Sequence, residues 1–268
     1  MKKITALFLL TILLFPVLNW AQTSIDSTSK ILVISDIDDT LKVASARNKI
    51  EFLVLMNTTV QFTGMAELFS ELDKNWGSQI QFSYVTNSPY YIESSRKKFL
   101  AQNRFMDGLV FYSPSLNDEN HKYVSIRKLL SDKTPTHVIF LGDNSNRDAQ
   151  VYFDIANEYK PQGMQFFTFI HRLYQDKVMV DPGQYFSYIT SIEIAKKLNQ
   201  DQLMDKTHYE DFLKLIYPQI ASEIETGQKP SQNSQAFPKF IKCSDFKWSL
   251  PFDFELIKLQ AFLLKLCK

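Results

Sequence analysis

Short apolar runs alternate with amphipathic stretches between residues 31 and 170, and this alternation constrains the fold more than any other feature of the sequence. The runs have the length of strands buried on both faces, and the stretches between them are long enough for helices. Repeated strand–helix units predict an α/β fold, a parallel sheet sandwiched by helices. The expected strands are residues 31–35, 80–85, 109–112, 137–141 and 165–170, and the expected helices are residues 64–74, 88–101, 122–130 and 147–159.

The composition excludes several classes of protein. The chain has 268 residues, of which 45% are hydrophobic and 22% charged, enough to bury a large core and too apolar for a disordered chain. Because 30 Lys and Arg balance 29 Asp and Glu, no basic field is available for nucleic acid, and we expect no nucleic-acid partner. Two cysteines exclude a disulfide scaffold and a zinc ribbon. The surplus of 22 Phe and 12 Tyr is expected mostly in the core.

The N-terminus is typical of a secretory signal peptide, assigned to residues 1–21. Two lysines precede an apolar run over residues 4–18, which is shorter than the roughly 20 residues that span a bilayer. We therefore expect an exported protein, periplasmic or secreted, with an uncleaved N-terminal membrane anchor as the alternative. In an oxidising compartment Cys243 and Cys267 either form a disulfide or remain two buried thiols, and the sequence leaves both open.

The expected domain organisation is a catalytic domain over residues 30–180 and a helical C-terminal extension over residues 181–268. Strands are expected to stop at Asp181, with helices over residues 190–204, 208–224 and 252–266. The last helix is amphipathic. Packing on the main domain is the simpler interpretation of its apolar face, and peripheral contact with a membrane surface is the alternative. The residues of this face are Phe252, Leu256, Leu259, Phe262, Leu263 and Leu266.

Four aspartates follow the first and fourth expected strands. Asp36 and Asp38 are two residues apart on an extended backbone, so their side chains point the same way. Asp143 and Asp148 follow the fourth strand and reach the same edge of a parallel sheet. Carboxylates this close repel unless a cation or proton offsets their charge, and oxygen ligands without a His or Cys cluster favour Mg²⁺. We expect all four as metal ligands, although an N-cap role explains Asp148 equally well.

Polar residues also follow the second and third strands. Thr86, Asn87 and Ser88 end the second strand, where a hydroxyl and the N–H groups of the expected helix start are suited to a phosphate oxygen. Lys122 stands at a helix N-terminus, where it opposes the helix dipole unless an anion lies nearby. The simpler interpretations are a helix cap for Thr86 and a solvated lysine.

These motifs, in this order, resemble the haloacid-dehalogenase (HAD) superfamily of phosphatases. Asp-x-Asp-x-Thr follows a strand, and a strand-terminal Thr, a Lys and Gly-Asp-x₄-Asp come after it. The resemblance is closer to the catalytic domain of the actin-patch-type phosphatidate phosphatases, over about residues 30–174. It rests on Ser35-Asp36-Ile37-Asp38-Asp39-Thr40, Gly64-Met65-Ala66-Glu67-Leu68, Tyr84-Val85-Thr86-Asn87-Ser88-Pro89 and Gly142-Asp143.

The resemblance implies a HAD-like Rossmannoid fold and a role for each motif residue. Asp36 becomes the nucleophile that forms an aspartyl-phosphate, and Asp38 the general acid and base. Asp143 becomes the main remaining Mg²⁺ ligand, with Asp148 in support. Thr86 and Lys122 neutralise the charge of the transferring phosphoryl group. Thr40 orients the motif, and Thr40, Asn87 and Ser88 are the expected substrate-binding residues.

The spacing of the motifs leaves little room for a cap domain. Only a short excursion around residues 47–62 fits between Thr40 and Thr86, so the site is expected to be near-capless and open. An open site suits a phosphate on a large or surface-embedded substrate, and Tyr90 and Tyr91 near the mouth are candidates for contact with an acyl chain. We therefore expect a Mg²⁺-dependent phosphomonoesterase resembling phosphatidate phosphatase. The alternatives are a broad-specificity exported acid-type phosphatase acting on soluble nucleotides or sugar phosphates, and a non-catalytic HAD-like binding module.

Overall fold

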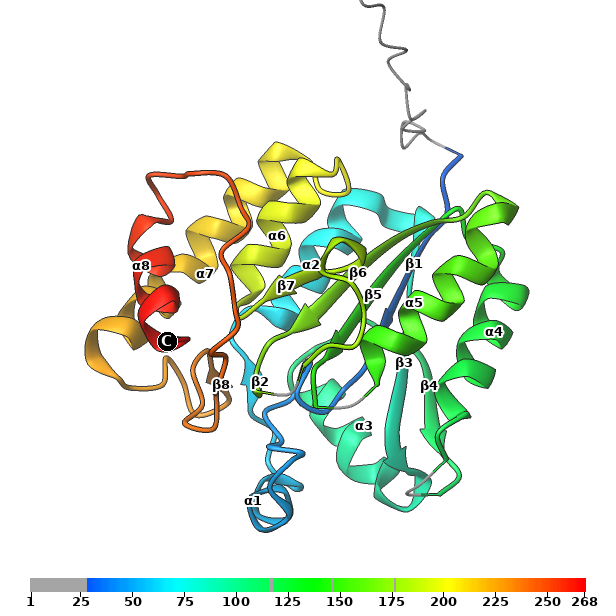
Figure 1. Ribbon diagram of the computed structural model, residues 1–268, viewed down its shortest axis with the longest axis horizontal. Helices are drawn as coiled ribbons and strands as arrows, with labels where there is room; N and C mark the ends of the chain where they lie inside the picture. The colour runs from blue at the N-terminus through cyan, green and yellow to red at the C-terminus, as the bar shows by residue number, and fades with distance from the viewer. Residues whose placement is uncertain (1–27, 116–117, 146, 176) are drawn as a thin grey trace, which may run out of the picture.

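Six parallel strands form the central sheet of the computed structural model, in the order β4-β3-β1-β5-β6-β7 (Figure 1). The structure describes residues 28–268 except 116–117, 146 and 176, so the expected signal peptide lies outside the described residues. The sheet strands are β1 (Ile31–Ser35), β3 (Ile80–Pro89), β4 (Gly108–Ser113), β5 (His137–Asp143), β6 (Gln165–His171) and β7 (Phe186–Tyr188).

Helices cover both faces of this sheet, which confirms the expected α/β sandwich. Alternate residues of β1 enter different cores: Val33 belongs to one buried cluster, and Leu32 and Ile34 to the other. The Leu32 side is closed by α4 (His121–Lys133) and α5 (Asp148–Tyr159). The Val33 side is closed by α2 (Met65–Trp76), α3 (Glu93–Gln102), α6 (Ser191–Gln200), α7 (Lys206–Thr226) and α8 (Ile257–Leu266). Short 3₁₀ turns are η1 (Gly77–Gln79), η2 (Tyr90–Ile92), η3 (Lys160–Gln162) and η4 (Pro182–Gln184).

The expectation that strands stop at Asp181 is wrong. β7 pairs with β6 at the edge of the sheet, and β8 (Ser234–Gln235) pairs with β2 (Gln61–Phe62) in a separate two-stranded sheet. Two or three residues are too few to show a period-2 pattern, so these strands depend on partners that are distant in the sequence. One buried cluster extends from Ile31 to Cys267, so the C-terminal segment shares a core with the sheet.

Two expected helices begin later than the sequence pattern indicates. The helix expected from Ser88 begins at Glu93, because β3 continues to Pro89, which pairs with Ser113 of β4. The helix expected from Phe252 begins at Ile257. Before it, the Asp253 carboxylate accepts the N–H of Glu255, a local turn that competes with the helix.

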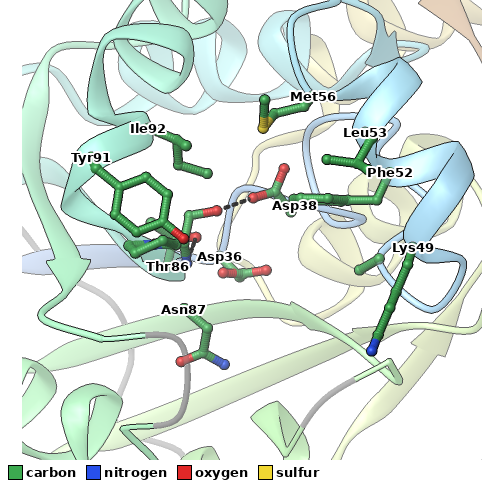
Figure 2. A pocket seen from close by; sticks show the side chains of 13 residues that line it. Asp36, Asp38, Lys49, Phe52, Leu53, Met56, Thr86, Asn87, Tyr91 and Ile92 are labelled. Atoms are coloured by element: carbon green, nitrogen blue, oxygen red, sulfur yellow. Dashed lines mark hydrogen bonds between the residues drawn. The ribbon is translucent and has the colours of Figure 1, made fainter.

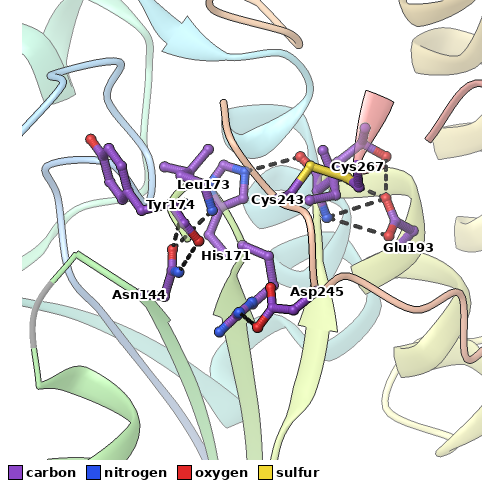
Figure 3. The surroundings of a disulfide bond; sticks show 11 residues. Asn144, His171, Leu173, Tyr174, Glu193, Cys243, Asp245 and Cys267 are labelled. Atoms are coloured by element: carbon purple, nitrogen blue, oxygen red, sulfur yellow. Dashed lines mark hydrogen bonds and ion pairs between the residues drawn. A yellow bond between two sulfur atoms is a disulfide. The ribbon is translucent and has the colours of Figure 1, made fainter. Parts of the chain in front are cut away.

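The C-terminal helix packs on the domain. Leu256, Leu259 and Leu263 are buried in the core. The disulfide that the sequence left open is formed, and it joins Cys267, just after α8, to Cys243 (Figure 3). Within the described residues, no helix combines the length and apolarity needed to cross a membrane.

The excursion expected around residues 47–62 contains a single short helix, α1 (Lys49–Leu55), which projects from the carboxyl-end edge of the sheet (Figure 1). Asn48 caps it by accepting the N–H groups of Ile50 and Glu51. None of its residues is buried, although the partly buried Leu55 at its end packs against one core. No larger cap stands between β1 and β3, in agreement with the near-capless expectation.

Candidate active site

The loop after β1 holds the first two aspartates in place. The N–H of Asp36 donates to the carbonyl of Leu141 at 2.9 Å, which continues the pairing with β5 beyond Ser35. Asp39 has a φ of 61°, and its carboxylate accepts the N–H groups of Ala44, Ser45 and Ala46. Asp39 had no role in the sequence interpretation, and it is the residue that fixes the turn after Asp38.

Asp36 and Lys122 form a buried ion pair at the centre of the site. The Lys122 Nζ lies 3.1 Å from Asp36 Oδ1 and 2.5 Å from Asp148 Oδ1. Lys122 is in the first turn of α4 and Asp148 is the first residue of α5, so two helix starts converge on the end of β1. Burial by itself lowers the pKa of Lys122, but the two carboxylates outweigh this effect and raise it. The anion expected next to Lys122 is thus present in the protein itself.

Three buried carboxylates form a candidate metal site. One oxygen from each of Asp36, Asp143 and Asp148 lies within 4.8 Å of the others. Burial raises the pKa of Asp36 to about 7; Lys122 opposes this rise, and Asp148 adds to it. Burial, followed by the charges of Asp148 and Asp36, raises the pKa of Asp143 well above its usual range.

The donor set fits a hard divalent cation. Asp143 Oδ2 is buried and has no hydrogen-bond partner in the described part of the chain, so one lone-pair direction is open. The donors are all oxygens, as Mg²⁺ prefers, and a cation would offset the repulsion that adds to burial in raising the two pKa values. Asp36 and Asp148 both pair with Lys122, so Asp143 is the strongest ligand candidate of the three.

The carboxylate of Asp38 is turned away from that cluster and bound by Arg96 of α3. Arg96 Nε and Nη2 donate to Asp38 Oδ2 at 3.0 and 2.9 Å, and Nη2 lies 2.8 Å from Oδ1. Ser88 Oγ donates to the same Oδ2 at 2.5 Å. Arg96 is completely buried, and its Nη1 donates to the carbonyl of Met56, just beyond α1, at 3.0 Å. One guanidinium therefore joins Asp38 to the end of α1.

The end of β3 differs from the expected phosphate cradle. Because α3 does not begin at Ser88, no helix N-terminus is present there. The N–H of Ser88 donates instead to Thr86 Oγ1 at 3.1 Å. Thr86 therefore has its oxygen engaged as an acceptor, and its hydroxyl proton is available for a substrate oxygen.

A cavity of about 710 Å³ contains Asp36, Asp38 and Thr86 and has mostly apolar walls. Figure 2 shows Tyr91 and Ile92 on one side and Phe52 and Leu53 on the other, with the two aspartates between them. The full set of lining residues is Asp36, Asp38, Ala46, Lys49, Phe52, Leu53, Met56, Thr86, Asn87, Ser88, Pro89, Tyr91 and Ile92.

The comparison with protein families matches this sheet and its motifs. A family model described as "Phosphatidate phosphatase APP1, catalytic domain" covers residues 31–167, half of the chain. The chain belongs to this family. The APP1 catalytic-domain family consists of phosphatases, hydrolases that act on phosphoric monoesters, and its HAD-type fold agrees with the six-stranded sheet.

Two solved structures are similar to part of the chain. "Structure of Pnkp1/Rnl/Hen1 complex" matches 54% of this chain and 47% of its own chain at 14% identity and a TM-score of 0.35. "Structure of the Pnkp1/Rnl/Hen1 RNA repair complex" matches 54% and 44% at 12% identity and a TM-score of 0.36. This chain thus spans less than half the length of either. No curated protein matches the sequence.

In this APP1 catalytic-domain member, the predicted site residues gather at one edge of the sheet with one exception. Asp36, Asp38, Thr86, Asn87 and Ser88 line the cavity, and Lys122, Asp143 and Asp148 adjoin Asp36. Thr40 is completely buried and does not line the cavity, so contact between Thr40 and substrate stays a prediction.

Sequence reasoning missed Arg96 and the wall that α1 supplies. A signal for Arg96 existed, since it precedes the buried Phe99 and Leu100 by three and four residues and so shares the inward face of α3. An arginine on such a face needs a buried anion, and Asp38 is that anion. For α1, the run Phe52-Leu53-Val54-Leu55 is apolar on all sides and shows no helical period.

Asn144, next to Asp143, ties the metal-site loop to the segment that follows β6. Its Oδ1 accepts the N–H groups of Leu173 and Tyr174, and its Nδ2 donates to the carbonyl of Tyr174 at 2.7 Å (Figure 3). Tyr174 in turn donates its hydroxyl to Asp39 at 2.6 Å. The loops after β1, β5 and β6 are therefore linked through side chains that have no reacting role.

Proposed function

We propose that this protein is a Mg²⁺-dependent phosphatidate phosphatase that works through an aspartyl-phosphate on Asp36. The observation that supports the proposal best is the cavity itself. It brings the Asp36 carboxylate and the Thr86 hydroxyl together with apolar walls from α1 and η2. These walls favour a phosphate ester whose organic part is apolar, because that part would contact them while the phosphate lies beside Asp36. A lipid phosphate has that chemistry.

The residues have distinct parts in two half-reactions. An Asp36 oxygen attacks phosphorus, and the ester oxygen leaves with the bonding electrons and takes a proton from Asp38. Water then attacks phosphorus, Asp38 accepts its proton, and the Asp36 carboxylate is released with inorganic phosphate. Thr86 donates to a phosphoryl oxygen and Lys122 offsets the negative charge during both transfers.

Asp36, Asp143 and Asp148 are the residues that would hold Mg²⁺, as their oxygens and the unpartnered Asp143 Oδ2 support. When bound, the cation neutralises charge on the transferring phosphoryl group and keeps the aspartates ionised.

We also propose that the protein is exported through residues 1–21. Support comes from the Cys243–Cys267 disulfide, since such bonds persist in oxidising compartments.

Release of phosphate from dispersed phosphatidate, measured with and without Mg²⁺, tests the proposal. We expect EDTA to abolish the release, and Asp36→Asn to reduce it by about a thousandfold or more because the amide is not a nucleophile. Asp154→Asn, on the outer part of α5, is the matched control and retains activity. Undiminished release by Asp36→Asn would exclude the nucleophile. Faster turnover of nucleotides or sugar phosphates than of phosphatidate would favour the soluble-substrate alternative.

A further inference from the structure

Two elements at the mouth of the cavity expose large apolar side chains. On α1, Ile50, Leu53 and Val54 are 78%, 65% and 70% exposed, and on η2 Tyr90 and Tyr91 are each 64% exposed. We call these five residues the rim patch. Isolated exposed apolar residues are ordinary, but five on two elements that border one cavity from opposite sides are not.

Polar contacts at its C-terminal end hold α1 on the protein, together with the packing of Leu55 on the core and of Phe52 against the Arg96 guanidinium. The buried Lys42 donates its Nζ to the carbonyl of Leu55 at 2.8 Å, and Arg96 and Ser95 donate to the carbonyl of Met56. Asn48 caps the other end. The helix is therefore capped locally at its start and held through backbone carbonyls at its end, and the exposed Ile50, Leu53 and Val54 are presented without being needed for its attachment.

The rim patch is continuous with the interior of the cavity. Leu53 and Tyr91 belong to both, since they are exposed and also line the cavity with Asp36. Ile50, Val54 and Tyr90 lie outside the lining. An apolar surface thus extends from the solvent-facing side of α1 and η2 to the nucleophile.

A positive charge lies beside the rim patch, and two of its members are amphipathic rings. Lys49 lines the cavity, is exposed, and has no ion pair within the described residues. Tyr90 and Tyr91 pack edge to face with centroids 6.3 Å apart. Tyrosine prefers the interface between lipid and water, and a lysine there attracts anionic headgroups.

We infer that the rim patch docks on the surface of a lipid bilayer, so that a lipid phosphate reaches Asp36 without leaving the aggregate completely. The occupant is a lipid surface rather than a protein, because the apolar route continues inward to the phosphate site and a free lysine accompanies it. This inference rests on the proposed lipid substrate, and it places the membrane contact on α1 and η2 instead of the C-terminal helix, where Leu256, Leu259 and Leu263 of the apolar face are buried in the core.

Vesicle binding tests the docking separately from catalysis. In an Asp36→Asn background, which prevents consumption of the lipid, co-sedimentation with vesicles of phosphatidylcholine and phosphatidate is compared for two variants. Ile50→Gln/Val54→Gln removes two outward apolar side chains that do not line the cavity. Glutamine has a helix propensity at least as good as that of the residues it replaces, so α1 is expected to stay helical. Leu215→Gln/Phe254→Gln is the matched control: these residues are 53% and 82% exposed and lie on α7 and before α8.

We expect the rim variant to bind vesicles at least about tenfold more weakly, and the control variant to bind like the parent. With Asp36 restored, the rim variant hydrolyses water-soluble dibutyryl phosphatidate at the parent rate and loses turnover only on vesicles. Equal vesicle binding by rim variant and parent would overturn the docking and would indicate a protein partner for the patch. Because dibutyryl phosphatidate turnover is measured on its own, its absence in the parent would contradict the proposed function instead.

Discussion

Arg96 is the residue whose position depends most on the folded structure. It is completely buried, it contacts both oxygens of Asp38, and it reaches the chain just beyond α1. Since Arg96 does not line the cavity, it acts through Asp38 rather than on the substrate. It is therefore a positioning residue for Asp38, the proposed general acid and base.

We predict that Arg96→Lys lowers kcat by about tenfold to a hundredfold and leaves KM for dibutyryl phosphatidate nearly unchanged. Lysine keeps the charge but loses the two-pronged contact with Asp38. Steady-state kinetics separates the two parameters, and Lys97→Gln, an exposed neighbour on α3, is the control. A change confined to KM would show that Arg96 contacts substrate.

Glu193 links stability to pH at a single residue. Burial raises its pKa to about 8, and the N–H and hydroxyl groups of Thr190 and the N–H of Ile189 only partly oppose the rise. The unfolded carboxyl has a pKa near 4.5. Between pH 4.5 and pH 8 the Glu193 carboxyl is protonated in the folded protein and ionised in the unfolded chain. The stability that depends on Glu193 is therefore complete below pH 4.5 and is lost as the pH rises toward 8.

The corresponding prediction is that Glu193→Gln flattens the fall in unfolding free energy between pH 5 and pH 8. The contribution of one such group is at most about 1.4 kcal/mol per pH unit. Urea denaturation at several pH values measures it, with Glu119→Gln on the surface as control. Parallel curves for Glu193→Gln and wild type would mean that Glu193 ionises freely in the folded protein.

At the scale of single residues, the site residues that could be predicted from the sequence are those that stand next to a recognisable strand. Asp36 and Asp38 follow a buried strand, and Asp143 ends another, so their meeting at one edge follows from sheet geometry. Arg96 was missed because its partner Asp38 is 58 residues away and no local pattern connects them.

At the scale of elements, α1 differs from the other helices. Its seven residues include none that is buried, and its two ends are held by Asn48, Lys42 and Arg96. A helix this short is marginal in water without such contacts. Its persistence thus depends on a few hydrogen bonds to the loop and to α3.

We predict that Asn48→Ala loosens α1 without unfolding the protein. Loss of the cap costs about 1 kcal/mol, which acts locally because none of the residues of α1 is buried. Hydrogen exchange should show faster exchange of the amides of Ile50 and Glu51, with an unchanged melting temperature. Asn157→Ala, at an exposed position of α5, is the control, and protection of α1 equal to wild type would contradict the prediction.

The main strands and helices were predictable because each is long enough to show its own period. β7 and β8 were not, because three- and two-residue strands have no period and form only where β6 and β2 offer an edge. The late start of α3 was missed for a similar reason, since the pairing of Pro89 with Ser113 extends β3 at the expense of the helix.

At the scale of the whole molecule, the C-terminal segment closes the fold onto the sheet. Cys243 and Cys267 are joined 24 residues apart, and the N–H of Lys242 donates to the carbonyl of Leu173, just after β6 (Figure 3). The disulfide therefore fastens the end of the chain beside the segment that Asn144 also holds.

We predict that Cys243→Ser/Cys267→Ser lowers the free energy of unfolding by about 2–4 kcal/mol, since the closed loop no longer restricts the unfolded chain. Denaturation of the variant, and of the wild type with and without dithiothreitol, measures the loss. The variant itself should be insensitive to the reductant. A wild type that is equally stable in both conditions would show that the bond does not form in solution.

The polar contacts that hold α1 separate substrate preference from folding stability, two properties that usually change together. Side chains that determine substrate preference are often also core residues, so altering them endangers folding. Here Ile50, Leu53 and Val54 can be exchanged while the backbone contacts of Lys42 and Arg96 continue to hold the helix. Under the proposed docking, the preference of this phosphatase for a lipid surface is therefore open to engineering, and to natural drift, at little cost in stability.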